Sequence, residues 1–135
     1  MEFENALNSI IEKIEQQKAL VSTEEATKMT FIMPFLSALG YDVFNPSVVV
    51  PEYTADIGTK KGEKVDYAIF KDGEPFILIE AKAHNENLDN HTNQLLRYFN
   101  TAPSIKFAIL TNGIEYRFFT DIDAPNVMDK SPFWW

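Results

Sequence analysis

Cysteine is absent from the sequence, which excludes several kinds of protein at once. Without cysteine the chain has no disulfide framework, no thiolate zinc site and no cysteine nucleophile. The absence also fits a reducing compartment. A chain of 135 residues nevertheless buries enough surface to fold without a disulfide or a structural metal, and 45% hydrophobic residues is an ordinary globular composition. We therefore expect a single domain over residues 1–135.

Positive charge is in deficit, since Lys and Arg total 12 against 20 Asp and Glu, and the net charge is −8. A protein that coats nucleic acids in general should be basic, so this class is excluded. No apolar run approaches the length of about 18 residues that would span a membrane. The acidic, amphipathic start lacks the basic and apolar blocks of a signal peptide. We expect a soluble, cytoplasmic protein without membrane contact.

Hydrophobic periodicity divides the domain into three segments. Apolar residues at helical spacing predict an amphipathic helix over residues 3–18, within an N-terminal segment of residues 1–21. The core is expected over residues 22–120. The tail of residues 121–135 ends in Phe-Trp-Trp and has two interpretations: it folds back on the core, or it is the cut edge of a longer protein.

A second helix is expected at the start of the core. Ser22 and Glu25 have the spacing of a capping box, which predicts a helix beginning there. Pro34 should kink this helix or restart it, because proline lacks an N–H and clashes with the preceding turn. Gly40 is the expected C-terminal cap.

Shorter β-branched and apolar segments predict the rest of the core. Strands are expected over residues 47–53, 64–70, 75–83, 105–111 and 114–120, and a helix over 86–101. The last two strands are separated by Asn112-Gly113, a strong hairpin signal. The order α-α-β-β-β-α-β-β indicates an α/β fold class, with a mixed central sheet and helices on both faces.

Charged residues end a predicted strand that is otherwise apolar. Residues 75–83 read PFILIEAKA, and Glu80 and Lys82 are two apart, so both point to the same side of the strand. Charges in such a strand are costly unless they are paired or bound to a metal. A surface Glu–Lys pair is the better interpretation of these two residues alone. Asp66 on the preceding strand shifts the balance toward a functional site.

The turn between the two strands decides whether Asp66 lies near Glu80. A two-residue loop would put Asp66 on the face away from Glu80. A three-residue loop, residues 71–73, puts Asp66 opposite Leu78 and diagonal to Glu80, about 7–8 Å away. The order Lys-Asp-Gly suits the longer loop. We therefore predict that Asp66, Glu80 and Lys82 converge.

Two carboxylates and a backbone carbonyl are the oxygen ligands that suit Mg²⁺, with water completing the octahedron. A lysine beside the metal can orient or help to deprotonate the attacking water, and it offsets charge in a phosphorane-like transition state. The pattern predicts the hydrolysis of phosphodiester bonds, with Mg²⁺ as cofactor and Mn²⁺ as its substitute.

Motifs further along the chain extend this pattern. VDYAIF, the turn KDG and FILIEAK are followed by QLLRY, a strand and TNG. This succession resembles the PD-(D/E)xK nuclease superfamily, and more closely the N-terminal nuclease domain of the type I restriction enzyme motor (R) subunit, over residues 22–120. Val65 stands where the superfamily name has proline. Valine at this position is common in these relatives. The resemblance implies a restriction-endonuclease-like fold.

The resemblance also implies a function and its main residues. Asp66 and Glu80 would be metal ligands together with the Ala81 carbonyl, and Lys82 would be the catalytic lysine. The chain would be an Mg²⁺-dependent DNA endonuclease module of a type I restriction system. Its partners would be DNA and the helicase motor, specificity and methyltransferase subunits.

Auxiliary residues follow from the same resemblance. Gln94 and Tyr98 match a Q-x-x-x-Y element that, in the type I enzymes, lies beside the active site and contacts nucleic acid or orients the metal site. They are four apart and therefore share a helix face. A glutamate on the first core helix often lies near the metal in this superfamily. Glu25 corresponds to it, and Glu24 is nearly as good a candidate.

A polar loop precedes the strand of Asp66 and carries three lysines. Lys60, Lys61 and Lys64 are candidates for contact with DNA phosphates. The glycines of this loop suggest a phosphate-binding loop only faintly, because the Gly-Lys-Ser/Thr ending is missing. Since acidic residues outnumber basic ones, few phosphate counterions would be released on binding, and we expect weak DNA affinity from this chain alone.

Two hypotheses from different classes follow. The first is the metal-dependent nuclease module. The second is a non-catalytic protein-interaction module that keeps the nuclease fold and uses the acidic surface, the apolar stripe of the first helix and the Phe-Trp-Trp end. Convergence of Asp66, Glu80 and Lys82 within about 6 Å would favour the nuclease. A broken hairpin register would favour the interaction module.

Overall fold

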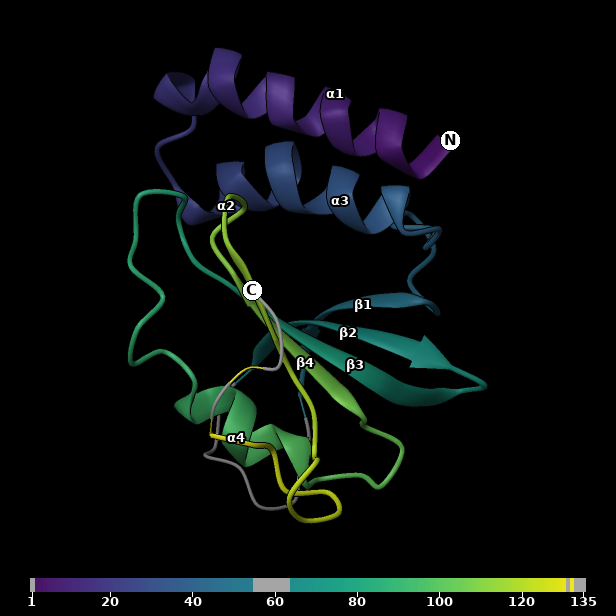
Figure 1. The fold of residues 1–135 in the computed structure, drawn as a ribbon. Coiled ribbons are helices and arrows are strands. Elements are labelled where there is room, and N and C mark those ends of the chain that lie inside the picture. Colours follow the sequence, from purple (N-terminus) through teal and green to yellow (C-terminus); the bar gives the residue numbers. More distant parts are fainter. Residues whose placement is uncertain (1, 55–63, 131, 133–135) are drawn as a thin grey trace.

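The computed structural model describes residues 2–54, 64–130 and 132 (Figure 1). The helical segments are α1 (Glu2–Gln17), η1 (Lys18–Leu20), α2 (Glu24–Thr27), η2 (Lys28–Ile32), α3 (Met33–Ala38) and α4 (Asn93–Phe99). The strands are β1 (Val49–Tyr53), β2 (Val65–Lys71), β3 (Glu74–Ala81), β4 (Phe107–Thr111) and β5 (Tyr116–Phe119). The predicted α/β class and element order are confirmed.

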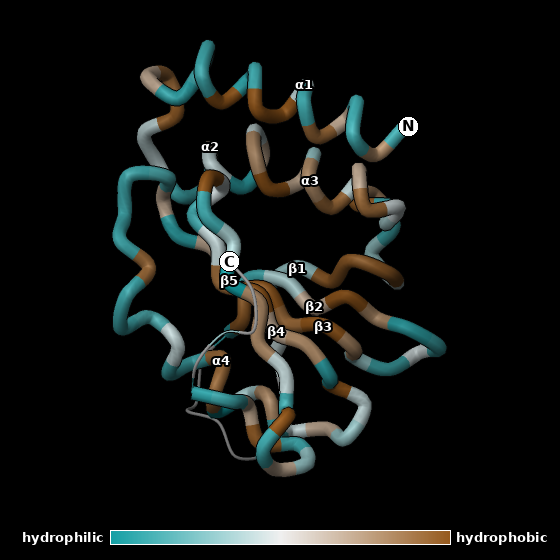
Figure 2. The backbone as a smooth tube through the Cα atoms, in the orientation of Figure 1, coloured by the Kyte–Doolittle hydropathy of each residue, from teal (hydrophilic) through white to brown (hydrophobic). Residues whose placement is uncertain are grey.

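The strands form one mixed sheet in the order β1-β2-β3-β4-β5. Only the β3–β4 pair is parallel, and α4 makes the crossover between these two strands. The other neighbours are antiparallel, as their short connections require. Hydrophobic residues run along the middle of the strands, while the tip of the β2–β3 hairpin is hydrophilic (Figure 2). No helix among the described residues is long and apolar enough to cross a membrane.

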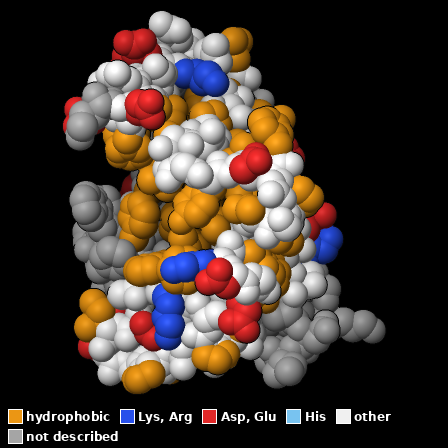
Figure 3. Space-filling view, turned by 90° about the vertical axis from the view of Figure 1, so that its right-hand side faces the viewer, with side chains coloured by type: hydrophobic (Ala, Val, Ile, Leu, Met, Phe, Trp, Pro, Cys, Tyr) orange, Lys and Arg blue, Asp and Glu red, His pale blue; other side chains and the backbone are white. Residues whose placement is uncertain are grey.

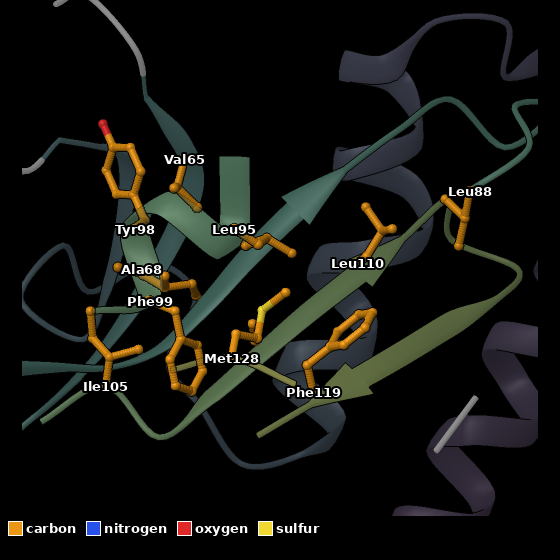
Figure 4. Packing of buried hydrophobic residues seen from close by; sticks show 12 residues of the cluster. Val65, Ala68, Leu88, Leu95, Tyr98, Phe99, Ile105, Leu110, Phe119 and Met128 are labelled. Atoms are coloured by element: carbon orange, nitrogen blue, oxygen red, sulfur yellow. The ribbon is translucent and has the colours of Figure 1, made fainter. Parts of the chain in front are cut away.

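Helices cover both faces of this sheet. On one face, α4 contributes Leu95, Tyr98 and Phe99 to a core that also takes in Met128 from the tail (Figure 4). On the other face, Ile32 and Leu36 of the η2–α3 segment pack on the strands. Helix α1 lies outside α3 and forms the outermost layer (Figure 1). The part of the tail that is described therefore folds back on the core at Met128.

The second helix is interrupted close to its start. Its N-cap is Thr23, whose Oγ1 accepts a hydrogen bond from the Ala26 amide at 3.0 Å, so the prediction of Ser22 as the cap is wrong by one residue. A π-type turn at η2 precedes Pro34, which stands in the first turn of α3. Proline is accommodated there because the first amides of a helix have no intrahelical partner. The prediction of a kink or a restart at Pro34 corresponds to the change from π-type to α-helical turns at Met33.

The β2–β3 hairpin differs from its predicted register. Lys71 pairs with Glu74, so the loop has two residues, and the predicted three-residue loop is wrong. Asp72 and Gly73 have φ values of 54° and 80°, as a type I′ turn requires, and that turn matches the twist of the strands. A bulge follows, because the register shifts between Ile69 and Phe70.

The bulge brings Asp66 to Glu80 by another route than the predicted one. Beyond it, Ala68 pairs with Leu78 and Tyr67 with Ile79, so Asp66 does not lie opposite Leu78. Continuing this register places Asp66 directly opposite Glu80. The predicted pairing was wrong, yet the two carboxylates still meet.

Helix α4 begins later than predicted, at Asn93 instead of residue 86. Asn87 accepts a hydrogen bond from the Asp89 amide, and Asn90 adopts a left-handed conformation with φ of 66°. Both are local turn arrangements that compete with helix formation. The residues predicted to start this helix therefore form turns, and Leu88 among them is buried in the core.

The connection between β4 and β5 packs against the second helix. The predicted hairpin is confirmed, although Thr111 pairs with Tyr116 and the connection is longer than Asn112-Gly113. The Asn112 side chain accepts from two amides of this loop and donates to the Glu86 carbonyl. Gly113 has φ of +85°, and a Cβ there would lie 3.0 Å from side-chain atoms of both Thr27 and Phe31. This close approach fixes the helical segment against the sheet.

We predict that Gly113→Ala destabilises the fold by about 2–4 kcal/mol, because it combines a left-handed backbone with a clash in a packed contact. Gly73 has a similar φ of +80° but nothing within 4 Å of its added Cβ. Gly73→Ala is therefore the matched control and should cost about 1 kcal/mol. Urea unfolding of both variants measures the difference, and equal losses of stability would contradict a role for the contact of Gly113 with Thr27 and Phe31.

Candidate active site

Asp66 and Glu80 lie side by side where β2 begins and β3 ends. The Asp66 amide donates to Glu80 Oε1 at 3.2 Å, and the Ala81 amide donates to Asp66 Oδ2 at 2.8 Å. Glu80 is only 6% exposed. Two carboxylates this close and this buried cannot both ionise freely, since each raises the cost of charging the other.

The pair therefore keeps one proton near neutral pH. Burial, a hydrogen bond with Asp66 and the negative charge of Asp66 together raise the pKa of Glu80 to about 8. Burial acts against ionisation of Asp66 too, but hydrogen bonds from Glu80, Lys28 and the Ala81 amide outweigh it and lower the pKa of Asp66. We assign the shared proton to Glu80 and the negative charge to Asp66.

Lys28 supplies the positive charge that balances this pair. Its Nζ lies 2.8 Å from Asp66 Oδ1 and 2.9 Å from Glu25 Oε1, and its side chain is only 10% exposed. The ammonium also lies 5.8 Å from the centre of the Tyr67 ring. Sequence reasoning missed Lys28. The available signal was its spacing of three and four residues from the adjacent acids at positions 24 and 25.

Both candidate glutamates of the first core helix flank Lys28. Glu25 contacts the ammonium directly, although its side chain is 82% exposed. Glu24 Oε1 lies 3.8 Å from the same Nζ. Burial and the negative charge of Asp66 raise the pKa of Glu24, which places it within electrostatic range of the pair. The structure thus brings both acids to the site and does not select Glu25 alone.

Lys82 follows the last residue of β3. Its amide donates to the Thr111 carbonyl at 2.8 Å, which continues the β3–β4 ladder by one residue. Its positive charge favours the ionised forms of Glu80 and Glu24, and so offsets a small part of the rise in the pKa of each. Lys82 therefore acts electrostatically on these two glutamates.

A cleft of about 240 Å³ opens beside Asp66 and Lys28. It is lined by Glu25, Lys28, Pro51, Glu52, Lys64, Asp66 and Tyr67. Lys64 lies 3.6 Å from Glu52 across this cleft, in an exposed ion pair that contributes little to stability. Of the predicted DNA-contact residues, Lys64 thus borders the site, whereas Lys60 and Lys61 fall outside the described residues.

Gln94 and Tyr98 act on the framework of the site. The Gln94 side-chain amide donates to the Lys64 carbonyl, two residues before Asp66. Tyr98 is fully buried in the core beneath α4, with its ring centre 6.1 Å from that of Tyr53. The structure therefore places Gln94 as a support for the start of β2. Contact of either residue with nucleic acid stays a prediction.

The donor atoms at the site suit a hard cation. Carboxylate oxygens of Asp66 and Glu80, with Ala81 next to them, are the oxygen set that Mg²⁺ prefers. Within the described residues, no group of three or more His, Asp or Glu side chains is arranged to hold a metal ion. Any metal would therefore depend on this carboxylate pair and on backbone or water oxygens.

Part of the chain matches the model of a known protein family. The family model for the N terminus of the type I restriction enzyme R protein matches residues 57–127, more than half of the chain. The chain belongs to this family. The predicted resemblance to the N-terminal domain of type I R subunits is thereby confirmed.

A solved structure supports the same assignment. It is a fragment of a protein assigned as the HsdR subunit of a type I restriction enzyme from Vibrio vulnificus YJ016. The match has a TM-score of 0.55 and 27% sequence identity, and covers 72% of this chain. It covers 21% of that protein, so this chain spans a small part of its length. A comparison with curated proteins gives no match.

The proton on Glu80 makes the stability of this R-subunit N-terminal domain depend on pH. The pKa of Glu80 rises from 4.5 to about 8 on folding, so its contribution to stability is full below 4.5 and is lost as the pH rises through 8. We predict that Glu80→Gln, which mimics the protonated acid, is more stable than the native chain at pH 9 by about 1–3 kcal/mol. At pH 4.5 the two should be similar.

Denaturant unfolding of both proteins at several pH values measures this effect. Glu74→Gln is the control, because Glu74 is exposed at the other end of β3. A Glu80→Gln variant that is less stable than the native chain at pH 9 would show that ionised Glu80 is structurally required.

Proposed function

We propose that this domain is an Mg²⁺-dependent DNA nuclease module of a type I restriction enzyme R subunit. The observation that carries the proposal is the contact of partly buried Asp66 with buried Glu80 at adjoining strand ends, with Lys82 directly after the last residue of β3. Burial of two touching carboxylates reduces stability, and a domain keeps such an arrangement when the groups have a task that needs them. Membership of the R-protein family makes phosphodiester hydrolysis the task that fits.

In this proposal each residue has a separate role. Asp66, Glu80 and the Ala81 carbonyl would hold Mg²⁺, which would supply Lewis acidity and lower the pKa of a water. Lys82 lies at the open end of β3, where its ammonium can orient that water and offset negative charge that develops on the phosphate. Gln94 keeps the start of β2, and so Asp66, in place through the Lys64 carbonyl.

Charge at the site has to change when the metal site forms. Glu80 must give up its proton to become a ligand, because a carboxylate binds metal in its ionised form. The Lys82 charge, which favours ionised Glu80, assists this step. Metal binding at pH 7 is therefore coupled to the loss of a proton from this pair.

The acidic chain limits what the module does alone. With 20 acidic against 12 basic residues, most DNA affinity has to come from other parts of the assembly. We propose the helicase motor, specificity and methyltransferase subunits as those partners, with DNA as the substrate. In this arrangement the domain contributes the cutting site and its partners deliver DNA to it.

The alternative, a non-catalytic interaction module, draws support from an apolar face. Hydrophobic side chains gather in the middle of the face shown in Figure 3, with charged side chains above and below them. Phe76, Phe107 and Phe118 are only partly buried at the sheet. Of the predicted interaction features, Phe3 and Ile11 of α1 are exposed, whereas the Phe-Trp-Trp end lies outside the described residues.

Metal binding separates the two proposals. We predict that Mn²⁺, titrated into isotope-labelled protein, broadens the amide signals of Asp66, Glu80 and Ala81, because paramagnetic broadening falls steeply with distance. The Glu80→Ala variant should lose this broadening while staying folded, and Glu74→Ala should retain it. Absence of localised broadening at millimolar Mn²⁺ in the native chain would contradict the nuclease proposal and favour the interaction module.

A further inference from the structure

Lys28 is a buried cation that the proposed hydrolysis does not use. Its Nζ lies within 4 Å of carboxylate oxygens from three acids: Asp66 at 2.8 Å, Glu25 at 2.9 Å and Glu24 at 3.8 Å. Its side chain is 10% exposed and that of Asp66 is 18% exposed, so little water screens the contact between these two. A lysine is seldom buried unless it is paired, and here the pairing is with the acids expected at the metal site.

The backbone holds Lys28 in this place. The residue starts the π-type turn η2, directly after the short helix α2 that carries Glu24 and Glu25. Thr27, the preceding residue, accepts a hydrogen bond from the His84 amide and packs near Gly113. The helix and the loops that follow β3 and β4 thus fix the position from which the Lys28 side chain reaches Asp66. π-type turns recur at functional sites in proteins.

A buried ammonium and a divalent metal ion would both bind the Asp66 carboxylate. Both need its negative charge, and Lys28 already contacts Oδ1 while the Ala81 amide contacts Oδ2. Two cations close to one carboxylate repel each other strongly in a site that water screens poorly. The Lys28 contact and metal coordination by Asp66 therefore compete.

We propose that Lys28 is the resident cation of this site, and that its ammonium has to leave Asp66 before this carboxylate can hold a divalent metal ion. The inference rests on the proposed function. Lys28 is a positioning residue in this scheme, since it keeps Asp66 and Glu25 together without metal. Its competition raises the metal concentration that the domain requires, so the isolated module stays inactive at metal concentrations that would otherwise occupy the site.

Mn²⁺ affinity of the intact chain tests this competition. We predict that Lys28→Met binds Mn²⁺ at least about tenfold more tightly than the native chain, a gain of about 1.4 kcal/mol. Lys28→Arg keeps the positive charge and should bind as the native chain does. Lys64→Met is the matched control, because Lys64 lines the same cleft but pairs with Glu52, and its removal should change the affinity much less. Isothermal titration calorimetry with MnCl₂ gives the three comparisons.

The outcomes separate this inference from the proposed function. Mn²⁺ binding by the native chain with equal or weaker binding by Lys28→Met would overturn the competition and leave the nuclease proposal standing. Failure of both proteins to bind Mn²⁺ at millimolar concentration would overturn both. If Lys64→Met increases the Mn²⁺ affinity as much as Lys28→Met does, the effect comes from the overall charge of the chain. This result would also overturn the inference.

A measurement on the native chain covers the case in which Lys28→Met fails to fold. Acetylation of lysines, followed by mass spectrometry, reports how accessible each amine is. Lys28 should react slowly without metal and several-fold faster in saturating Mn²⁺, because its ammonium is released from the buried contact. Lys13, on α1, is the internal control and should react at one rate throughout. A Lys28 rate that does not rise with Mn²⁺ would refute the displacement.

Discussion

The contact between Asp66 and Glu80 is the constraint on which the rest of the site depends. Two carboxylates lie together at the edge of the core, and the chain reduces the resulting repulsion in two ways: a proton stays on Glu80, and the Lys28 ammonium binds Asp66. Both the protonation of Glu80 and the contact with Lys28 are reversible. A fold with apolar residues in place of the two carboxylates would often be at least as stable, but it would not allow such a change. An arrangement that is costly yet adjustable is what a cation-binding site requires.

Much of the fold serves to hold this contact in place. The bulge in the β2–β3 hairpin aligns Asp66 with Glu80, and Gln94 on α4 fixes the start of β2 through the Lys64 carbonyl. From the opposite side, the close packing of Gly113 on the second helix sets the position of Lys28. The two helical layers thus approach the same strand ends from different faces of the sheet, so the site needs both of them.

The sequence predicts the elements and the central acids better than it predicts their geometry. Element order follows from periodicity, and the importance of Glu80 follows from its place in an apolar strand, both of which are local signals. The meeting of Asp66 with Glu80 was predicted through a three-residue loop that the structure does not have. The hairpin register depends on a bulge, which has no signature in the residues around Ile69. Burial of Lys28 was not predictable, because a lysine reaches a carboxylate 38 positions away only through the packing of the helix on the sheet.

The acidic composition of the chain extends to the site itself. A proton neutralises Glu80 and the Lys28 ammonium offsets Asp66, but Glu24 and Glu25 lie at the same ammonium, so the site keeps part of the excess negative charge. A polyanion such as DNA would therefore meet negative charge at the site as well as on the rest of the surface. In the proposed function, basic surface on a larger assembly would offset this repulsion. If the proposed nuclease role holds, this separation of cutting from binding would confine cleavage to DNA that the partners present.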